Sequence, residues 1–194
     1  MKPSESRQIA EEVIALYEQH GSADYIGEPV SQLEHMSQCA HMAAAEGYDE
    51  EVILAAFFHD IGHICPINGQ LKEQMDGYGV MRHEKVGANY LREKGFSERL
   101  AQLVESHVQA KRYLTFAHPE YFDQLSEASK RTLSFQGGRM TAEEAHAFEN
   151  HDLFRLSIRM REWDEKAKEE HQPVADLHEI REMCVRHLQT VNQH

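Results

Sequence analysis

A histidine and an aspartate stand side by side at the end of the most hydrophobic segment of the chain, in the sequence FHDIGH over residues 58–63. Burying such a pair at a helix end is costly unless a partner or a metal neutralises it. Neighbouring side chains of a helix point about 100° apart, so His59 and Asp60 can share one metal between them, or Asp60 can bridge two. An isolated pair of this kind is more often a plain helix end, at which the histidine stabilises the last carbonyls.

Further histidines and a second aspartate make a metal site the better interpretation. His107 continues an apolar stripe at helical spacing, with Lys111 one turn further on the same face, and His83 lies on another such stripe. His35 is one position off the apolar stripe of its segment, and Asp164 continues an inward-facing series. Nitrogen and oxygen ligands without a thiolate favour two irons or two manganese ions bridged by a carboxylate over a closed structural zinc site. The predicted ligands are His35, His59, Asp60, His83, His107 and Asp164.

The segments that position these residues are all predicted to be helical. Apolar residues recur at helical spacing, and no alternating strand pattern or hairpin signal separates them. Pro29 suits the first turn of a helix, Ser97 suits an N-cap, and Thr141 with Glu144 has the spacing of a capping box. Residues 64–80 are expected to form a long loop beside the site. Helices are expected over 5–19, from Pro29 to Gly47, over 49–61 and 82–94, after Ser97, over 118–124 and 126–135, after Thr141, and over 151–169 and 176–190.

Length and composition predict a single cytoplasmic, all-α domain over residues 1–194. The chain is long enough to bury a core and has no repeat or linker that would divide it. The net charge of −13 argues against a nucleic-acid partner, and an anionic substrate would need a local cationic pocket. No stretch approaches the roughly 18 apolar residues that cross a membrane. The three cysteines lack CxxC spacing and no secretion signal is visible, which favours a reducing compartment.

Longer strings extend the pattern of ligands over most of the chain. The order of His35, the pair His59–Asp60 and Asp164 resembles the HD-domain superfamily, a helical bundle, and His83 and His107 resemble its dinuclear elaboration. Over about residues 24–168 the chain resembles the small mixed-valent di-iron HD-domain oxygenases of organophosphonate degradation, of the PhnZ and TmpB type. The strings that carry the resemblance are DYIGE (24–28), LEH (33–35), AAFFHDIGH (55–63), RHEKVGA (82–88), ESHVQAKRYLT (105–115), LSEASK (125–130), QGG (136–138) and RMREWDEKAK (159–168).

The resemblance implies a role for each matching residue. An Fe(II)/Fe(III) pair would be held by His35, His59, Asp60 and Asp164 on one side and by Asp60, His83 and His107 on the other, with Asp60 as the bridge. Glu28 would face an ammonium group of the substrate. Tyr25 would occupy an iron coordination position until the substrate arrives; the alternative is that both residues only anchor their loop. The implied contacts with the phosphonate are His63, Lys111, Ser129 and Arg161.

The implied reaction is oxygen-dependent cleavage of the carbon–phosphorus bond of a 1-hydroxyphosphonate. The substrate would be (1R)-1-hydroxy-2-(trimethylammonio)ethylphosphonate, giving glycine betaine and phosphate, or unmethylated (1R)-1-hydroxy-2-aminoethylphosphonate, giving glycine and phosphate. The irons and the substrate would supply all four electrons. No organic cofactor is therefore implied, and the sequence has no Rossmann glycine pattern. The expected partners are the organophosphonate and dioxygen, with neither membrane nor nucleic acid.

Two other functions share the same His and Asp core. One is an HD-domain phosphohydrolase that uses a metal-bound hydroxide, and the other is a non-catalytic HD module that only binds a ligand. The two added histidines and the loop with Tyr25 and Glu28 favour the oxygenase. The sequence leaves open whether the substrate amine is free or trimethylated, because Glu28 could pair with either cation. Tyr25, Tyr113 or Trp163 could form a cation–π wall for a trimethylated amine, but each is equally plausible as a core aromatic.

Overall fold

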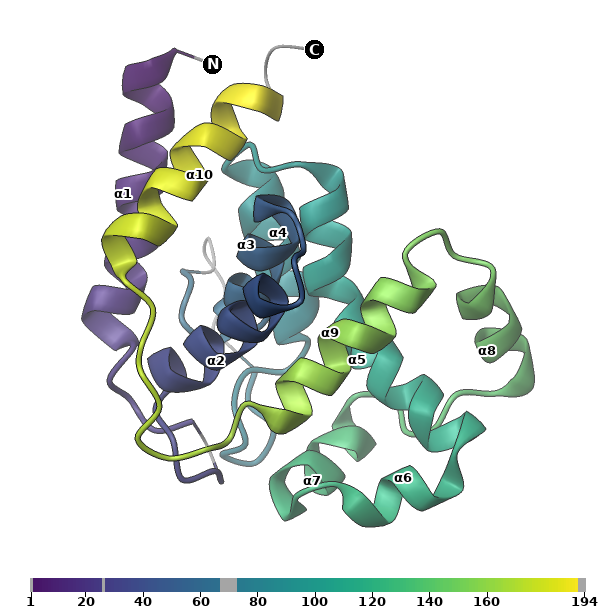
Figure 1. The fold of residues 1–194 in the computed structure, drawn as a ribbon. Coiled ribbons are helices and arrows are strands. Elements are labelled where there is room, and N and C mark those ends of the chain that lie inside the picture. Colours follow the sequence, from purple (N-terminus) through teal and green to yellow (C-terminus); the bar gives the residue numbers. More distant parts are fainter. Residues whose placement is uncertain (1, 26, 67–72, 192–194) are drawn as a thin grey trace.

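The computed structural model describes residues 2–25, 27–66 and 73–191, and in these ranges the regular elements are helices, with no strand beyond two isolated bridges. The predicted all-α fold is confirmed (Figure 1). Among the described residues, no helix is both long and apolar enough to cross a membrane. The helices are α1 (Pro3–His20), α2 (Gln32–Ala45), α3 (Glu50–Phe58), the 3-10 turn η1 (Ile61–His63), α4 (His83–Glu93), α5 (Glu98–Ala117), α6 (Pro119–Gln124), α7 (Glu127–Phe135), α8 (Ala142–Glu149), α9 (Phe154–Lys166) and α10 (Leu177–Val191).

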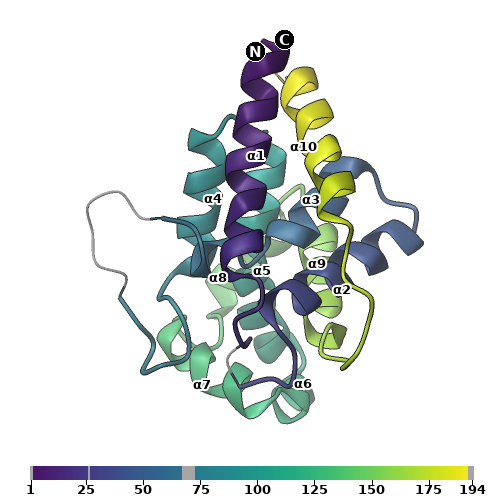
Figure 2. The same cartoon turned by 90° about the vertical axis from the view of Figure 1, so that its left-hand side faces the viewer.

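Helix α3 lies at the centre, as its composition predicts. Its side chains from Leu54 to Phe58 are all buried, because a helix that is apolar all round must be covered on every side. Helices α2, α5 and α10 pack against α3, and α9 packs against α2 and α5. Figures 1 and 2 show α1 and α10 side by side along one edge, while α6, α7 and α8 form an excursion between α5 and α9.

Side-chain caps mark the start of helices α2, α3, α5, α7 and α8. Ser97 caps α5, and the predicted capping box of Thr141 and Glu144 is present at the start of α8. The predicted start of α2 at Pro29 is wrong. The helix begins at Gln32, because the Ser31 hydroxyl accepts a hydrogen bond from the Glu34 amide and the Glu34 carboxylate accepts one from the Ser31 amide. This reciprocal capping box stabilises a later start than the proline does.

Two further predicted helices are shorter than expected. The helix predicted over 49–61 uses Asp49 as its N-cap and ends at Phe58, so His59 and Asp60 lie at its end, ahead of the turn η1. The helix predicted over 151–169 covers only Phe154–Lys166. The predicted loop over 64–80 has no helix in its described parts, 64–66 and 73–80, and residues 67–72 lie outside the described residues.

Two glycines let the turn η1 pack directly on helix α4. A Cβ added at Gly62 would lie 1.9 Å from the main-chain oxygen of His83, and one added at Gly87 would lie 3.0 Å from the amide nitrogen of Gly62. Such distances are far inside van der Waals contact, so no larger residue fits at Gly62 without moving the backbone. The segment with Asp60 and the first turn of α4 with His83 are therefore held against each other by backbone packing.

This packing makes a prediction about Gly62. Gly62→Ala should lower the free energy of unfolding by about 1–3 kcal/mol, as overpacking does, and should lower metal content because His83 is displaced. Gly47→Ala is the control. Its Cβ meets nothing within 4 Å, so it should lose only the about 1–2 kcal/mol of a left-handed backbone and keep its metal. Chemical denaturation and elemental analysis test both; wild-type stability and metal content in Gly62→Ala would contradict the prediction.

Candidate metal centre and its cavity

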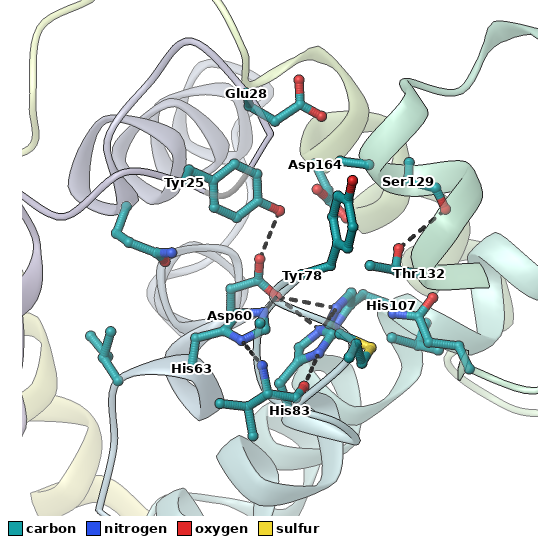
Figure 3. A pocket seen from close by; sticks show the side chains of 18 of the residues that line it. Tyr25, Glu28, Asp60, His63, Tyr78, His83, His107, Ser129, Thr132 and Asp164 are labelled. Atoms are coloured by element: carbon teal, nitrogen blue, oxygen red, sulfur yellow. Dashed lines mark hydrogen bonds and ion pairs between the residues drawn. The ribbon is translucent and has the colours of Figure 1, made fainter. Parts of the chain in front are cut away.

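A cavity of about 420 Å³ opens among the loops and helix ends on one side of the bundle. Ten of the twelve site residues predicted from the sequence line this cavity. The other two, His35 and His59, lie behind Asp60 and Asp164. Figure 3 shows Tyr25, Asp60, His83, His107 and Asp164 converging on its floor. The residues come from α2, the end of α3, α4, α5 and α9, so the site forms only when these elements are packed together.

The four histidines on the floor form two pairs. The Nε2 atoms of His35 and His59 lie 3.1 Å apart, and those of His83 and His107 also lie 3.1 Å apart. Each histidine is held by its other ring nitrogen, which is the usual arrangement around metal ligands. The Nδ1 atoms of His35, His59, His83 and His107 lie 2.8, 2.8, 3.3 and 2.7 Å from the main-chain oxygens of Ala167, Ala56, Val80 and Val104 respectively.

Asp60 stands between the two pairs and presents one oxygen to each. Its Oδ1 lies 3.1 Å from Nε2 of His83 and 3.4 Å from that of His107. Its Oδ2 lies 3.5 Å from Nε2 of His59 and 3.9 Å from that of His35. This division between two pairs is the arrangement expected of a bridging carboxylate.

Asp164 faces only the pair formed by His35 and His59. Its Oδ1 lies 3.4 Å from Nε2 of His35 and 3.9 Å from that of His59. Although burial alone would raise the pKa of Asp60 and of Asp164, the histidines around Asp60, and Arg161 with the histidines around Asp164, hold both pKa values well below the usual range. Both carboxylates are therefore ionised and available as ligands.

The donor set fits cations. Because the Nδ1 atoms of His35 and His59 donate to carbonyls, the Nε2 lone pairs of this pair face one another, and burial lowers the pKa of His59 to about 4. Burial alone would also lower the pKa of His83, but the neighbouring Asp60 carboxylate raises it above the ordinary value. Asp60 Oδ1 is buried without a hydrogen-bond partner. Facing lone pairs beside an unpartnered anionic oxygen are unfavourable unless positive charge lies among them. The described residues thus form a cluster that could bind metal ions.

Two neighbours of the cluster differ from the ligands in protonation. Cys39 lies close enough to His35 and His59 to share an ion, but burial raises the pKa of its thiol well above the usual value, so it is not a thiolate. His63 lies close to Asp60 and His83, yet its Nδ1 accepts a hydrogen bond of 3.0 Å from the Val80 amide. Its proton is then on Nε2, which makes His63 a donor toward the cavity.

Tyr25 covers the bridging carboxylate. Its hydroxyl donates a hydrogen bond of 2.9 Å to Asp60 Oδ2, and its ring stacks on His35 with centroids 3.9 Å apart. Burial and the charges of Asp60 and Asp164 raise the pKa of the Tyr25 hydroxyl well above its ordinary value. The residue therefore lies within reach of the metal edge as a neutral phenol.

Lys111 and Arg161 supply positive charge to the opposite wall. Lys111 donates to the main-chain oxygen of Ser129 at 3.1 Å and to Oγ1 of Thr132 at 2.9 Å, and burial and Arg161 lower the pKa of Lys111 to about 7. Arg161 donates to Oγ of Ser129 at 2.9 Å and also pairs with Asp164. This is the local cationic pocket that an anionic substrate of an acidic protein requires.

Arg161 has two further partners that the sequence reasoning missed. It donates to the hydroxyl of Tyr121 at 2.9 Å and forms an ion pair with Glu165. Thr132, the partner of Lys111, was missed as well, although it lies one helical turn after Ser129 on α7. For Glu165 the available signal was its place one turn after Arg161 within RMREWDEKAK.

The far end of the cavity holds Glu28 beside residues not foreseen from sequence. Glu28 accepts a hydrogen bond of 2.6 Å from Ser126 and pairs with Lys168 at 3.0 Å. Tyr78 also lines the cavity, with its hydroxyl 2.6 Å from Arg131.

Of the three aromatic residues for which the sequence leaves open a cation–π wall or a place in the core, only Tyr25 lines the cavity. Trp163 is buried in the core, with its indole nitrogen 3.0 Å from Glu46, and Tyr113 packs against Phe148 and Phe154. For these two residues the structure supports packing rather than a cation–π wall.

Comparison with known proteins agrees with this geometry. The family model described as HD domain matches residues 33–133, which is more than half of the chain. The chain is 41% identical over 160 residues to the [1-hydroxy-2-(trimethylamino)ethyl]phosphonate dioxygenase (glycine-betaine-forming) of Leisingera caerulea, covering 82% of this chain and 80% of that protein. It is 36% identical over 193 residues to the hydroxymethylphosphonate dioxygenase of Gimesia maris, covering 94% and 92%. An uncharacterized protein of Acanthamoeba polyphaga mimivirus is 43% identical over 176 residues, covering 91% and 80%.

The chain belongs to the HD-domain family, which is metal-dependent, and its described residues include a His and Asp cluster that could bind metal ions. Within that family it is an oxygenase of the group that contains the two named dioxygenases. The resemblance found in the sequence is thereby confirmed at the level of the family.

The two histidine pairs lead to a prediction about metal content. His35→Ala and His83→Ala should each lose about one of two bound ions, whereas Asp60→Ala should lose both, because only Asp60 faces both pairs. Cys39→Ser is the control and should keep both ions, since the thiol is protonated. Elemental analysis and thermal unfolding with and without added metal measure these differences. Full metal content in Asp60→Ala, or loss of an ion in Cys39→Ser, would contradict the assignment.

Proposed function

We propose that the protein uses dioxygen to break the carbon–phosphorus bond of a 1-hydroxyphosphonate, with an Fe(II)/Fe(III) pair as cofactor. The observation that carries the proposal is the division of the two Asp60 oxygens between two histidine pairs at the floor of a cavity whose opposite wall is cationic. A phosphonate held by the cationic wall would then lie close to metal ions held by the histidine pairs. The names of the relatives in Leisingera caerulea and Gimesia maris, both phosphonate dioxygenases, support the same reaction.

The cavity residues support binding of the substrate at both of its ends. We assign contacts with the phosphonate to Lys111, Ser129, Arg161 and the Nε2 donor of His63, because ammonium and guanidinium groups bind such oxyanions strongly. Glu28 would lie beside the group carried on the second carbon, which is an ammonium in (1R)-1-hydroxy-2-aminoethylphosphonate and a trimethylammonium in its methylated form. Tyr25 would cover the metal edge until the substrate replaces its hydrogen bond to Asp60.

The proposed ligands of the iron pair are His35, His59, Asp60 and Asp164 for one ion and Asp60, His83 and His107 for the other. When bound, the pair would supply the activation of dioxygen. The carboxylate and phosphate products together contain the atoms of the substrate and of one dioxygen, apart from released protons. The oxidation therefore needs no further reductant and no organic cofactor.

The test is phosphate release and oxygen uptake with each 1-hydroxyphosphonate, in air and under argon. We expect one dioxygen consumed per phosphate in air and no catalytic phosphate release under argon. A phosphohydrolase would release phosphate at the same rate under argon, because its nucleophile is water. That outcome, or protein holding only zinc without a coupled Fe(II)/Fe(III) signal in electron paramagnetic resonance, would contradict the proposal.

Lys111→Ala should raise the KM for phosphonate roughly tenfold to a hundredfold while metal content stays unchanged, because a charge-assisted contact is worth about 1.5–3 kcal/mol. Lys111 is a cleaner test than Arg161, which also pairs with Asp164. Lys85→Ala, which removes an exposed lysine from α4, is the matched control and should leave KM unchanged. Steady-state kinetics decide, and an unchanged KM in Lys111→Ala would refute the assigned position of the phosphonate.

Tyr25→Phe should keep its metal and still turn over, but lose activity faster than wild type when incubated in air without substrate. The phenylalanine keeps the stack on His35 and removes the hydroxyl that covers the Asp60 carboxylate. Residual activity after timed incubation in air, with samples under argon as reference, measures the difference. Equal loss in both proteins would show that Tyr25 does not protect the site.

A further inference from the structure

Side chains of alternating charge run from the far end of the cavity to the metal cluster. Lys168 Nζ lies 3.0 Å from Glu28 Oε1 and 3.0 Å from Glu165 Oε1. Glu165 pairs with Arg161, and Arg161 pairs with Asp164, whose other oxygen faces His35. The end of the cavity that holds Glu28 is thus connected through charged pairs to the wall that holds Arg161.

Lys168 is already the cation beside Glu28. It lines the cavity just beyond the end of α9, and its side chain is only 17% exposed. Burial alone would lower the pKa of Lys168, but Glu165 and Asp164 raise it above the ordinary value, so the residue stays charged. The other polar contact of Glu28, from the Ser126 hydroxyl, is neutral.

A second cation cannot approach Glu28 without meeting Lys168. Like charges a few ångströms apart repel strongly in a partly buried site. A substrate whose second carbon carries an ammonium or trimethylammonium must therefore share Glu28 with Lys168 or displace it. A substrate without that group leaves the pair of Glu28 and Lys168 intact.

We infer that Lys168 is a specificity-determining residue, which occupies the position of a substrate cation beside Glu28 and so weakens binding of 1-hydroxyphosphonates that carry an ammonium or trimethylammonium group relative to short ones that lack it. The inference rests on the proposed function. Glu165 gives Lys168 a second partner, so Lys168 can leave Glu28 for a cationic substrate without becoming unpaired. Glu165 also holds Arg161, which connects this displacement to the phosphonate wall.

The experiment compares kcat/KM for two phosphonates in wild type and Lys168→Met. One is [1-hydroxy-2-(trimethylamino)ethyl]phosphonate, with a cationic end, and the other is hydroxymethylphosphonate, without one. Methionine keeps most of the apolar stem and removes the charge. We expect the ratio of the two kcat/KM values to shift toward the cationic substrate by about fivefold or more. The shift should appear in KM rather than kcat, because Lys168 contacts neither the metal ligands nor the phosphonate wall.

Two variants control for charge and for packing. Lys166→Met removes the same charge from an exposed position two residues away and should leave the ratio at the wild-type value. Lys168→Arg keeps the charge and should also stay near wild type. In a Glu28→Gln background, Lys168→Met should shift the ratio by less than it does in wild type, because the neutral side chain no longer attracts a substrate cation to the position beside Lys168.

The outcomes separate this inference from the function on which it rests. Wild-type turnover of at least one phosphonate with an unshifted ratio in Lys168→Met would overturn the inference alone. An equal shift in Lys166→Met, or an undiminished shift in the Glu28→Gln background, would overturn it too, since the effect would then not depend on the position beside Glu28. Absence of oxygen-dependent phosphate release from both phosphonates in wild type would contradict the proposed function and this inference together.

Discussion

The structure depends on one requirement, which is to hold four imidazoles and two ionised carboxylates together inside an apolar bundle. Each of these groups is costly to bury alone, and the two carboxylates repel one another. The main-chain carbonyls that bind the four Nδ1 atoms fix the direction of the four imidazole rings. These carbonyls belong to the same packed segments that form the bundle. The central position of α3 follows, because its end must present His59 and Asp60 to the four helices α2, α4, α5 and α9 at once.

The cavity reconciles an acidic protein with an anionic substrate. The chain carries a net charge of −13, yet the wall opposite the histidines contains Lys111 and Arg161, both almost fully buried. Burial is what makes these two cations effective over a short range, since the surrounding acidic surface is screened by solvent and salt while they are not. The same burial weakens the hold of Lys111 on its proton, so an anion that enters the cavity also stabilises the charged form of Lys111.

Periodicity and composition were sufficient to predict the residues on the inward faces of helices. His83 and His107 lie on apolar stripes, and the apolar stripe of a helix indicates which face is buried once the helix is packed. The start of α2 was misjudged because Pro29 and Ser31 are both compatible with a helix start, and only the reciprocal bonds of Ser31 and Glu34 decide between them.

Contacts between side chains that are far apart in the sequence could not be predicted from periodicity and composition. Lys168 lies 3.0 Å from a carboxylate that is far away in sequence, and no spacing rule connects them. Trp163 and Tyr113 show the converse, since an aromatic residue close in sequence to a site residue can face the opposite side of its helix. The family resemblance supplied the role of Glu28, but the charge that balances it is visible only in the packed molecule.

The contact of Gly62 with the backbone of α4 also determines how the centre responds when its ions change. Because Asp60 and His83 are carried on main-chain segments in direct contact, their separation cannot relax through side-chain rotation alone. A donor set held in this way would offer the proposed iron pair nearly the same arrangement in each oxidation state, so that little movement of the ligands would accompany the gain or loss of an electron. The backbone contact at Gly62 would thus make the segments that carry Asp60 and His83 the stiff part of the proposed centre.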